Sequence, residues 1–264
     1  MSIALSDMNI FYDSVLKKLF FNGKPFEGSI RFLDDMKDVI YDRELSGGQS
    51  PKRELYYMFR DICKDEKDKD AVVENSLRYD ITVIPPCFIG EEFVKTQGHA
   101  HSFVDGTDIT YPEMYQILSG QAIYVFEKRD GEQIHTYYVC GNKGDIVIVP
   151  PDYSHVTVNP SVDETLIMAN WVERNFQSVY EPILKSHGLG FYYVRDCDGK
   201  DLFIENSSNN TLAELQELKP INPELIGLKE GESMYHLVER PEQLEFLVKP
   251  QNYGEMFMEA LKSV

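Results

Sequence analysis

The sequence is poor in basic residues, in cysteine and in tryptophan. Lysine and arginine number 26 against 44 aspartates and glutamates, which gives a formal charge of −18. Nucleic acid and anionic membrane are therefore unfavourable partners, because their phosphates would be repelled at long range. The four cysteines are widely spaced and form no C-x-x-C pair. With no secretory leader at the start, we expect them to be reduced thiols in a cytoplasmic protein.

Long apolar runs are also missing, since none approaches the roughly 18–20 residues that cross a membrane. A chain of 264 residues can form one sizeable core with extensions, or two small domains. A composition of 42% hydrophobic and 27% charged residues is ordinary for a soluble globular protein. Sixteen tyrosines and fifteen phenylalanines favour strands, because aromatic side chains pack well on a pleated surface.

Residues 1–70 are predicted to form a helical lead that packs on the rest of the chain. Apolar residues recur at helical spacing within 6–21: Met8, Phe11, Val15 and Leu19. Asn22-Gly23 would end this helix, and a second helix is expected over 51–63. The mixed charge run 64–70 (KDEKDKD) is typical of a solvated loop or a fraying helix end.

From about residue 79 the pattern changes to short alternating runs separated by turn residues. Strands at intervals of roughly 8–12 residues predict an all-β sandwich or barrel, which we assign to residues 71–205. Residues 206–264 are predicted to be an extension packed on the barrel rather than an independent domain. Within it, the capping-box pattern Thr211–Glu214 predicts a short helix ended by Pro220, and 256–261 predicts a final helix.

Two of the six histidines, His99 and His101, lie two residues apart in GHAH. On a strand this spacing puts both rings on one face. Glu113 begins a run E-x6-G, and further on G-x5-P-x4-H-x3-N contains His155. A single histidine on a β-strand is more often a hydrogen-bonded core residue than a ligand, but these elements in this order are far more specific. Three imidazoles and a carboxylate suit Fe(II), Mn(II), Ni(II) or Zn(II), with positions left open for substrate oxygens.

The two blocks resemble the two motifs of the cupin superfamily, whose members are double-stranded β-helix barrels of the jelly-roll type. The resemblance implies an all-β cupin barrel, here with N-terminal helices and a C-terminal extension. One position departs from the second motif, because Asp152 stands where glycine is expected. Aspartate tolerates turn conformations, so the turn can be made another way.

The sequence is most similar to the cupin-type (archaeal-type) glucose-6-phosphate isomerases. Three stretches carry this resemblance: 31–42, 82–101 and 149–160. It covers about residues 30–195 and fades over the last seventy. It implies one divalent metal per chain, Fe(II) before Mn(II), Ni(II) or Zn(II), on a set of four ligands: His99, His101, Glu113 and His155. It also implies catalysis by Glu113 and Tyr115, and sugar phosphate bound by a second set: Thr82, Thr96, Gly98, Tyr115 and Tyr180.

Two departures concern the mouth of the site and the phosphate. The stretch SFVDGTDITYP between His101 and Glu113 is longer than the family's interval, so it contains an insertion. The family also has a histidine after the last core strands that helps to hold phosphate. ANWVERNFQSVYEP offers no match for this histidine, although the resemblance implies that Tyr180 corresponds to a nearby tyrosine of the family. Phosphate would then be bound by threonine hydroxyls and by backbone N–H groups of 96–98. Arg78 could add charge, whereas Lys95 is expected to be a solvated residue on the opposite face.

The chemistry implied is interconversion of glucose 6-phosphate and fructose 6-phosphate. Glu113 could shuttle a proton through a cis-enediol while Tyr115 orients the substrate, or hydrogen could move as hydride without a base. The same ligands would also suit an Fe(II) dioxygenase, and a non-enzymatic sugar-binding cupin is a third reading. The resemblance further implies a homodimer and a cytoplasmic enzyme of glycolysis and gluconeogenesis. Trp171 is expected in the core, and Asn170 is taken as structural.

Overall fold

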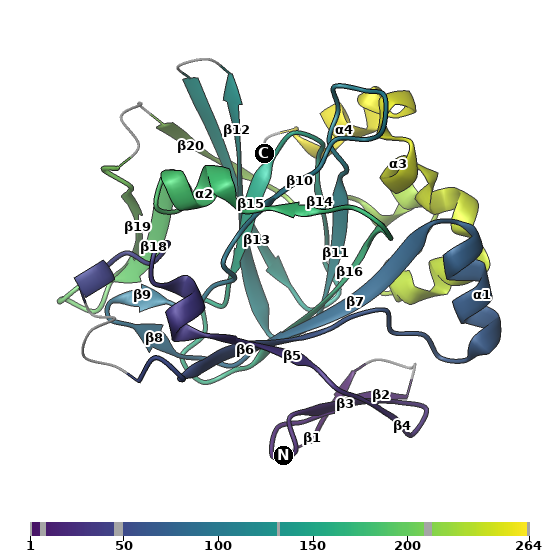
Figure 1. The fold of residues 1–264 in the computed structure, drawn as a ribbon, viewed down its shortest axis with the longest axis horizontal. Coiled ribbons are helices and arrows are strands. Elements are labelled where there is room, and N and C mark those ends of the chain that lie inside the picture. The colour runs from purple at the N-terminus through teal and green to yellow at the C-terminus, as the bar shows by residue number, and fades with distance from the viewer. Residues whose placement is uncertain (1, 6–8, 45–49, 131–132, 209–212, 263–264) are drawn as a thin grey trace.

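The computed structural model describes five segments: residues 2–5, 9–44, 50–130, 133–208 and 213–262. Strands dominate these segments, and the few helices lie mostly near the C-terminus (Figure 1). The all-β fold class predicted from the sequence is confirmed. Within the part of the chain that is described, no helix is long and apolar enough to span a membrane.

The largest element is an antiparallel six-stranded sheet with the order β14-β11-β16-β7-β6-β5. Its strands are β5 (Ser29–Phe32), β6 (Glu54–Phe59), β7 (Leu77–Ile84), β11 (Glu113–Ser119), β14 (Ile146–Val149) and β16 (Leu166–Glu173). A four-stranded sheet with the order β15-β12-β13-β20 faces it. This sheet consists of β12 (Gln121–Asp130), β13 (Gln133–Asn142), β15 (Ser154–Val158) and β20 (Ala213–Leu218).

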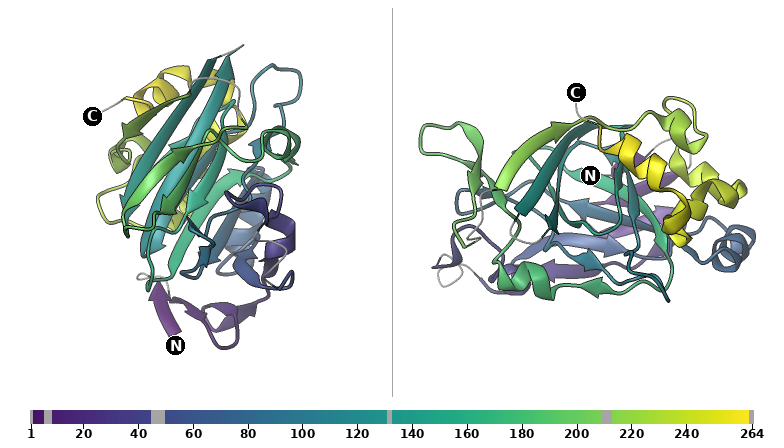
Figure 2. Two further views of the ribbon diagram at one scale, coloured as in Figure 1. Left: turned by 90° about the vertical axis from the view of Figure 1, so that its left-hand side faces the viewer. Right: turned by 90° about the horizontal axis from the view of Figure 1, so that it is seen from above.

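The two sheets enclose one hydrophobic cluster and so form the barrel seen end-on in Figure 2. The interior cluster draws on both sheets, with Tyr115 and Met168 from the larger and Tyr124 and Val156 from the smaller. This arrangement is the two-sheet barrel expected from the sequence. One edge of the smaller sheet is the parallel pair β13–β20, whereas its other pairs are antiparallel.

Smaller sheets surround the barrel. An N-terminal meander contains β1 (Ser2–Leu5), β2 (Ile10–Asp13), β3 (Lys18–Phe21) and β4 (Lys24–Phe26). At one end of the barrel lie β8 (Phe88–Ile89), β9 (Glu92–Phe93), β18 (Phe191–Arg195) and β19 (Asp201–Glu205). At the mouth, β10 (Ala100–His101) pairs with β17 (Ser178–Val179).

The helices are η1 (Leu33–Met36), α1 (Glu66–Glu74), α2 (Glu181–Lys185), η3 (Pro223–Ile226), η4 (Met234–Glu239), η5 (Pro241–Leu244), α3 (Glu245–Val248), η6 (Pro250–Asn252) and α4 (Gly254–Ala260).

Strict alternation along the central strands determines what each face of the larger sheet holds. On β16, Met168 and Asn170 point into the barrel, whereas Ala169 and Trp171 point outward into a second hydrophobic cluster. The same alternation places Asp80 inside and Tyr79 outside on β7. Neighbouring residues in the sequence therefore serve different faces of the sheet.

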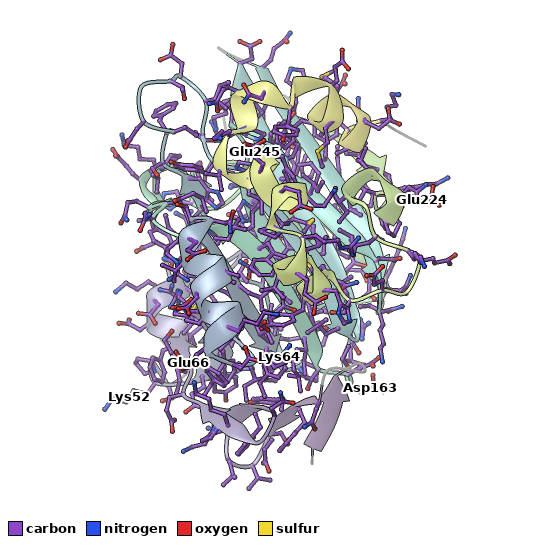
Figure 3. All side chains as sticks on the ribbon, turned by 90° about the vertical axis from the view of Figure 1, so that its right-hand side faces the viewer. Lys52, Lys64, Glu66, Asp163, Glu224 and Glu245 are labelled. Atoms are coloured by element: carbon purple, nitrogen blue, oxygen red, sulfur yellow. The ribbon has the colours of Figure 1, made fainter. Side chains whose placement is uncertain are left out.

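The C-terminal segment covers the outer face of this sheet, as the yellow and green helices in front of the strands show in Figure 3. Trp171 is fully buried there and donates its indole N–H to the carbonyl of Met234 at 2.8 Å. Tyr235 donates to Asp68 on α1 at 2.8 Å. The core position expected for Trp171 is thus observed. We propose on this packing that residues 206–264 are an extension of the barrel domain 71–205 rather than a domain of their own.

The N-terminal lead is not helical as predicted. Residues 10–26 form β2, β3 and β4, with Ile10, Tyr12 and Phe21 buried by alternation rather than by a helical stripe. Asn22 and Gly23 have φ values of 49° and 75°, which makes them a two-residue hairpin turn rather than a helix end. The prediction failed because a small set of apolar positions fits the helical period and the strand period equally well.

Three further helix assignments are corrected. The helix expected over 51–63 is the strand β6, where pairing with β5 and β7 buries aromatic residues on both faces and outweighs local propensity. The helix expected after 211 is the strand β20, although 211 and 212 lie outside the described residues. Conversely, the charge run 64–70 begins the helix α1, whose N-cap Asp65 accepts from the backbone N–H of Asp68. The final helix, α4, lies where it was expected.

Candidate active site

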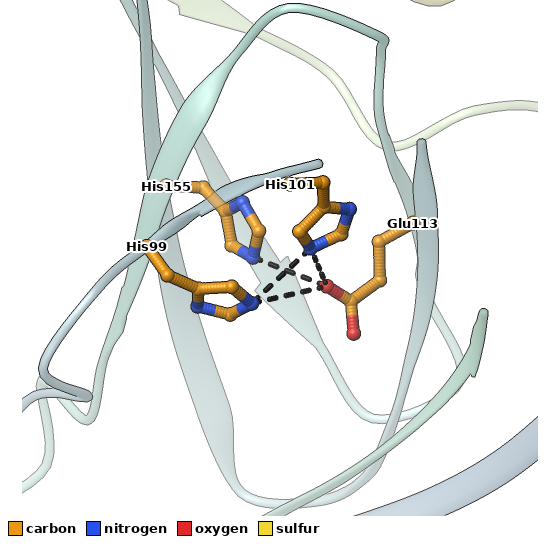
Figure 4. A group of neighbouring side chains, drawn as sticks. All are labelled: His99, His101, Glu113 and His155. Atoms are coloured by element: carbon orange, nitrogen blue, oxygen red, sulfur yellow. Dashed lines mark hydrogen bonds and ion pairs between the residues drawn. The ribbon is translucent and has the colours of Figure 1, made fainter. Parts of the chain in front are cut away.

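The three histidines and Glu113 meet inside the barrel (Figure 4). Their candidate ligand atoms all lie within 4.8 Å of one another. Glu113 Oε2 is 3.1 Å from His101 Nε2, 3.2 Å from His155 Nε2 and 4.0 Å from His99 Nε2. The two imidazole nitrogens of His99 and His101 are 3.1 Å apart. The other carboxylate oxygen of Glu113 is turned away from the three rings.

This cluster fits a divalent cation. The Nδ1 of His101 lies 2.8 Å from the carbonyl of Tyr111, which can only accept, so Nδ1 carries the proton and Nε2 presents a lone pair. Burial lowers the pKa values of His99 and His155, which keeps both rings neutral. Lone pairs of neutral imidazoles thus converge on a buried carboxylate oxygen. A cation at their centre would stabilise an arrangement that is otherwise repulsive.

Glu113 is ionised in this setting. Burial alone would raise its pKa, but N–H groups of His101 and His155 beside Oε2, or a cation in place of those protons, hold the pKa well below its usual value. Tyr115, two residues along β11, places its hydroxyl 3.0 Å from His155 Nε2. Burial and the neighbouring Glu113 raise the pKa of Tyr115 well above its usual value, so the hydroxyl keeps its proton. The site therefore pairs a carboxylate with a hydrogen-bond donor on the same strand face.

Gly98 allows the histidine strand to approach the barrel wall. Its φ is +80°, and a Cβ added there would come within 2.4 Å of a methyl group of Val156. The backbone N–H of His99 donates to the carbonyl of His155 at 3.2 Å, and the reverse bond is 3.0 Å. Only glycine fits this position without displacing Val156.

Asp152, which replaces the glycine expected in the second motif, contacts the insertion between His101 and Glu113. Asp152 adopts a φ of +71°, so it makes the left-handed turn in place of the expected glycine. Its carboxylate accepts from the backbone N–H of Thr110 at 3.1 Å, and its own N–H donates to the Thr110 hydroxyl at 2.6 Å. Thr110 belongs to the predicted insertion, whose Tyr111 carbonyl orients His101. The aspartate thus holds the insertion next to His101.

A pocket opens beside this cluster, and all the residues predicted to bind substrate line it: Thr82, Thr96, Gly98, Tyr115 and Tyr180. The Thr96 hydroxyl accepts from the backbone N–H of Thr157 at 2.9 Å, which leaves its proton free to donate. In the segment where the family resemblance implies a phosphate-binding histidine, Phe176 and Ser178 line the pocket. The Phe176 ring lies 4.2 Å from the ring of His101.

Three arginines also line the pocket, and sequence reasoning had considered only Arg78 among them. Arg31 hydrogen-bonds to Tyr56 and Tyr180, and its buried Nε has no partner among the described residues. Arg60 donates to the Ser29 hydroxyl at 2.9 Å. These cations supply the local positive charge that an anionic ligand needs in a protein of net charge −18.

Strand alternation could have revealed part of this wall. Counting back by twos from Thr82 along β7 gives Asp80 and Arg78, and all three line the pocket. Asn170, taken as structural, lines it as well. The interpretation of Lys95 as a solvated lysine is wrong. Its side chain is buried, paired with Glu92 and donates to the carbonyl of Val39 at 2.8 Å.

Comparison with known proteins places these residues in a family context. The family model described as "Glucose-6-phosphate isomerase (GPI)" matches residues 31–210. Glucose-6-phosphate isomerase from Thermococcus litoralis is 32% identical over 136 residues, which is 50% of this chain and 62% of that protein. The enzyme of the same name from Pyrococcus abyssi is 29% identical over 140 residues, 53% of this chain and 67% of its own length. The matches therefore span about two thirds of these relatives.

Among solved structures, the vicilin from hazelnut (Corylus avellana) superimposes with a TM-score of 0.35 and 11% identity. The superposition covers 58% of this chain and 32% of the vicilin.

Proposed function

The chain belongs to the glucose-6-phosphate isomerase family, and we propose that it interconverts glucose 6-phosphate and fructose 6-phosphate with a bound divalent metal. The convergence of His99, His101, His155 and Glu113 within 4.8 Å, beside a pocket lined by arginines, is the observation that carries this proposal. In this proposal the first feature would act on the reacting carbons and the second would bind the phosphate.

The metal would be held by the same four side chains, one ion per chain. Fe(II) is our first choice, and Mn(II), Ni(II) and Zn(II) also suit three imidazoles and one carboxylate. When bound, the ion would polarise the carbonyl and the neighbouring hydroxyl of the open-chain sugar.

Glu113 and Tyr115 are proposed as the catalytic residues. Only one oxygen of Glu113 faces the histidine rings, so its other oxygen can reach a proton on the substrate. A carboxylate can carry this proton between the two reacting carbons in an enediol route. The protonated Tyr115 hydroxyl would donate a hydrogen bond to a substrate oxygen next to them. If hydrogen moves as hydride instead, the same two groups orient the substrate.

The phosphate would bind at the end of the pocket formed by Thr82, Thr96, Gly98 and Tyr180. Arg31 supplies the charge there, because its unpartnered Nε and its contacts with Tyr56 and Tyr180 place it at this end. Arginine is suited to this role because its planar group presents several fixed donors to phosphate oxygens. This arrangement supports binding of a phosphorylated hexose without the histidine that the sequence lacks.

The cellular setting belongs to the same proposal. An enzyme with this activity would act in glycolysis and gluconeogenesis in the cytoplasm. We also propose a homodimer, as the family resemblance implies.

The test is formation of fructose 6-phosphate from glucose 6-phosphate by metal-stripped protein after Fe(II), Mn(II), Ni(II) or Zn(II) is added back. Activity restored by one metal in the wild type and absent in His99→Ala would establish the proposal and name the metal. Metal binding without turnover by any of the four would refute the isomerase activity while keeping the metal site.

A further inference from the structure

The middle of the pocket wall holds an amide and a carboxylate that neither the metal centre nor the phosphate end uses. Asn170 on β16 stands directly opposite Asp80 on β7 and, on its other side, opposite Tyr115 on β11. Opposed residues on antiparallel strands have Cβ atoms about 4.5–5.5 Å apart, so the three side chains form one row. Asn170 is 5% exposed and Asp80 is 7% exposed, and both line the pocket.

Asn170 is not explained by packing alone. No hydrogen bond joins its amide to another group within the ranges that the structure describes. The residue is mostly buried, but its amide atoms are not fully enclosed, because the side chain lines the pocket. An amide that opens toward a pocket in this way can bind a ligand group there.

Asp80 is held rigidly from behind. Its Oδ1 accepts from the backbone N–H of Asp61 at 2.8 Å, and Arg78 Nε lies 3.0 Å from Oδ1 and 2.9 Å from Oδ2. The Arg78 guanidinium itself is fixed, because it lies 5.3 Å above the Phe176 ring and donates to the carbonyl of Arg174. A carboxylate has about four acceptor positions, so Asp80 can still accept from a ligand hydroxyl.

The row lies between the two ends of the proposed substrate. Along β11, Tyr115 is two residues from the metal ligand Glu113, and along β7, Asp80 is two residues from Thr82 at the phosphate end. Each two-residue step along a strand is about 7 Å. An open-chain sugar phosphate with its reacting carbons at the metal and its phosphate at Thr82 would pass in front of this row.

We propose that Asn170 and Asp80 bind the hydroxyl groups on the carbons between the reacting pair and the phosphate. The Asn170 amide both donates and accepts hydrogen bonds, and Asp80 accepts them, so together they can recognise a chain of hydroxyl-bearing carbons. They are specificity-determining residues, and the inference rests on the proposed function. The site thereby distinguishes a hexose phosphate from other small phosphorylated molecules that would satisfy the phosphate end alone.

The test is calorimetric titration of the metal-loaded full chain with two probes, sorbitol 6-phosphate and inorganic phosphate. Sorbitol 6-phosphate carries the middle hydroxyls but no carbonyl to isomerise, whereas inorganic phosphate reports the phosphate end alone. Asn170→Leu removes the hydrogen-bonding groups at nearly constant shape. Gln116→Leu is the matched control, because Gln116 lies on the outer face and its amide binds Glu232 and Met234 of the C-terminal segment.

Asn170→Leu is expected to weaken sorbitol 6-phosphate about 10-fold and to leave inorganic phosphate unchanged. Gln116→Leu should lower the melting temperature with both affinities unchanged. Equal losses for both probes in Asn170→Leu, or no loss for either, would overturn the inference, and Asn170→Ala repeats the comparison if the leucine variant does not fold. Failure of the wild type to bind either probe would instead refute the proposed function, and this inference with it.

Discussion

The two faces of the six-stranded sheet are made by the same strands but do different work. On the outer face, Tyr79 and Trp171 stand opposite each other with ring centroids 4.9 Å apart, and Tyr235 of the C-terminal segment closes over them. On the inner face, one residue along, Asp80 and Asn170 stand opposite each other beside an open pocket. At these positions the outer face is apolar apart from the buried Tyr79 hydroxyl, whereas the inner face, which elsewhere carries the barrel's hydrophobic cluster, presents polar groups to the pocket.

Adjacent residues of one strand therefore contribute to stability on the outer face and to the proposed chemistry on the inner face. The outer cluster gains from the removal of large apolar surfaces from water. The inner face has buried charges and orphaned polar groups, which cost stability and are retained where they bind a ligand. Mutations on the inner face should therefore reduce activity, whereas mutations on the outer face should reduce the free energy of unfolding.

The largest effect is expected from the proposed metal ligands on the inner side of the barrel. His155→Ala should reduce isomerase turnover about 10,000-fold, because a metal that polarises substrate oxygens supplies several kcal/mol of transition-state stabilisation. Turnover and metal content are measured together on the purified variant. His135→Ala is the control, since His135 is exposed on β13 and lies outside the cluster. Full metal content and full turnover in His155→Ala would show that His155 is not a ligand.

The next effect tests the outer face. Trp171→Ala should reduce the free energy of unfolding by about 3–5 kcal/mol, because it removes a fully buried indole and leaves the carbonyl of Met234 without its donor. Urea denaturation measures this loss. Below the unfolding transition, turnover per folded molecule should stay within about twofold of wild type. A variant that is folded but inactive would show that the two faces are coupled rather than separate.

A smaller effect is expected where the C-terminal segment contacts α1. The hydroxyl of Tyr235 donates to the buried Asp68 and accepts from the backbone N–H of Lys64, both at 2.8 Å. Tyr235→Phe should therefore cost about 1–3 kcal/mol of unfolding free energy, because it removes both bonds around a buried carboxylate. Tyr253→Phe serves for comparison, since its bond to the half-exposed Glu245 should be worth less than about 1 kcal/mol. Equal losses of unfolding free energy in the two variants would show that the Tyr235 hydrogen bonds do not stabilise the contact between the C-terminal segment and α1 more than the Tyr253 bond stabilises its own site.

The two faces also explain which parts of the molecule could be predicted from the sequence. The sequence predicted that four residues meet, and the structure brings them together: His99, His101, Glu113 and His155. This could be predicted because a metal-binding motif has residue types and spacings that are rare by chance. The barrel could be found because its strands alternate with turn residues between them. The N-terminal meander could not, since Phe11 and Leu19 fit a helical stripe as well as a strand, and only pairing with neighbouring strands decides between them.

The pocket wall was missed for a different reason. Alternation along one strand gives Asp80 from Thr82, but Arg31 and Asn170 come from other strands far apart in the sequence, and no local pattern connects them with it. Only the register that puts Asp80 opposite Asn170 brings them together. The packing of the C-terminal extension on the barrel was predicted, but the sequence does not show that Met234 and Tyr235 would cover Trp171, because this contact depends on the tertiary structure.

The smallest effect is expected at Asp61, which lies just after the end of β6, at the rim of the six-stranded sheet. Burial alone would raise the pKa of Asp61, but hydrogen bonds from Arg174 and Lys69 outweigh it and lower the pKa from 3.8 to about 2. A carboxylate with a lowered pKa in the folded state stabilises the protein above its unfolded pKa, and the stabilisation disappears as the pH falls toward the folded value. Because the Asp61 side chain is 32% exposed, solvent screening reduces its contribution to about 1 kcal/mol.

Asp61→Asn should therefore lower the free energy of unfolding by about 1 kcal/mol at pH 7, and the difference from wild type should shrink between about pH 4 and pH 2. Urea denaturation of both proteins at a series of pH values measures it, with Asp34→Asn as an exposed carboxylate control. The backbone N–H of Asp61 still donates to Asp80 in the variant, so sugar-phosphate binding should not change. A pH-independent loss, or a parallel loss of ligand affinity, would mean that the Asp61 side chain supports the inner face directly rather than the rim alone.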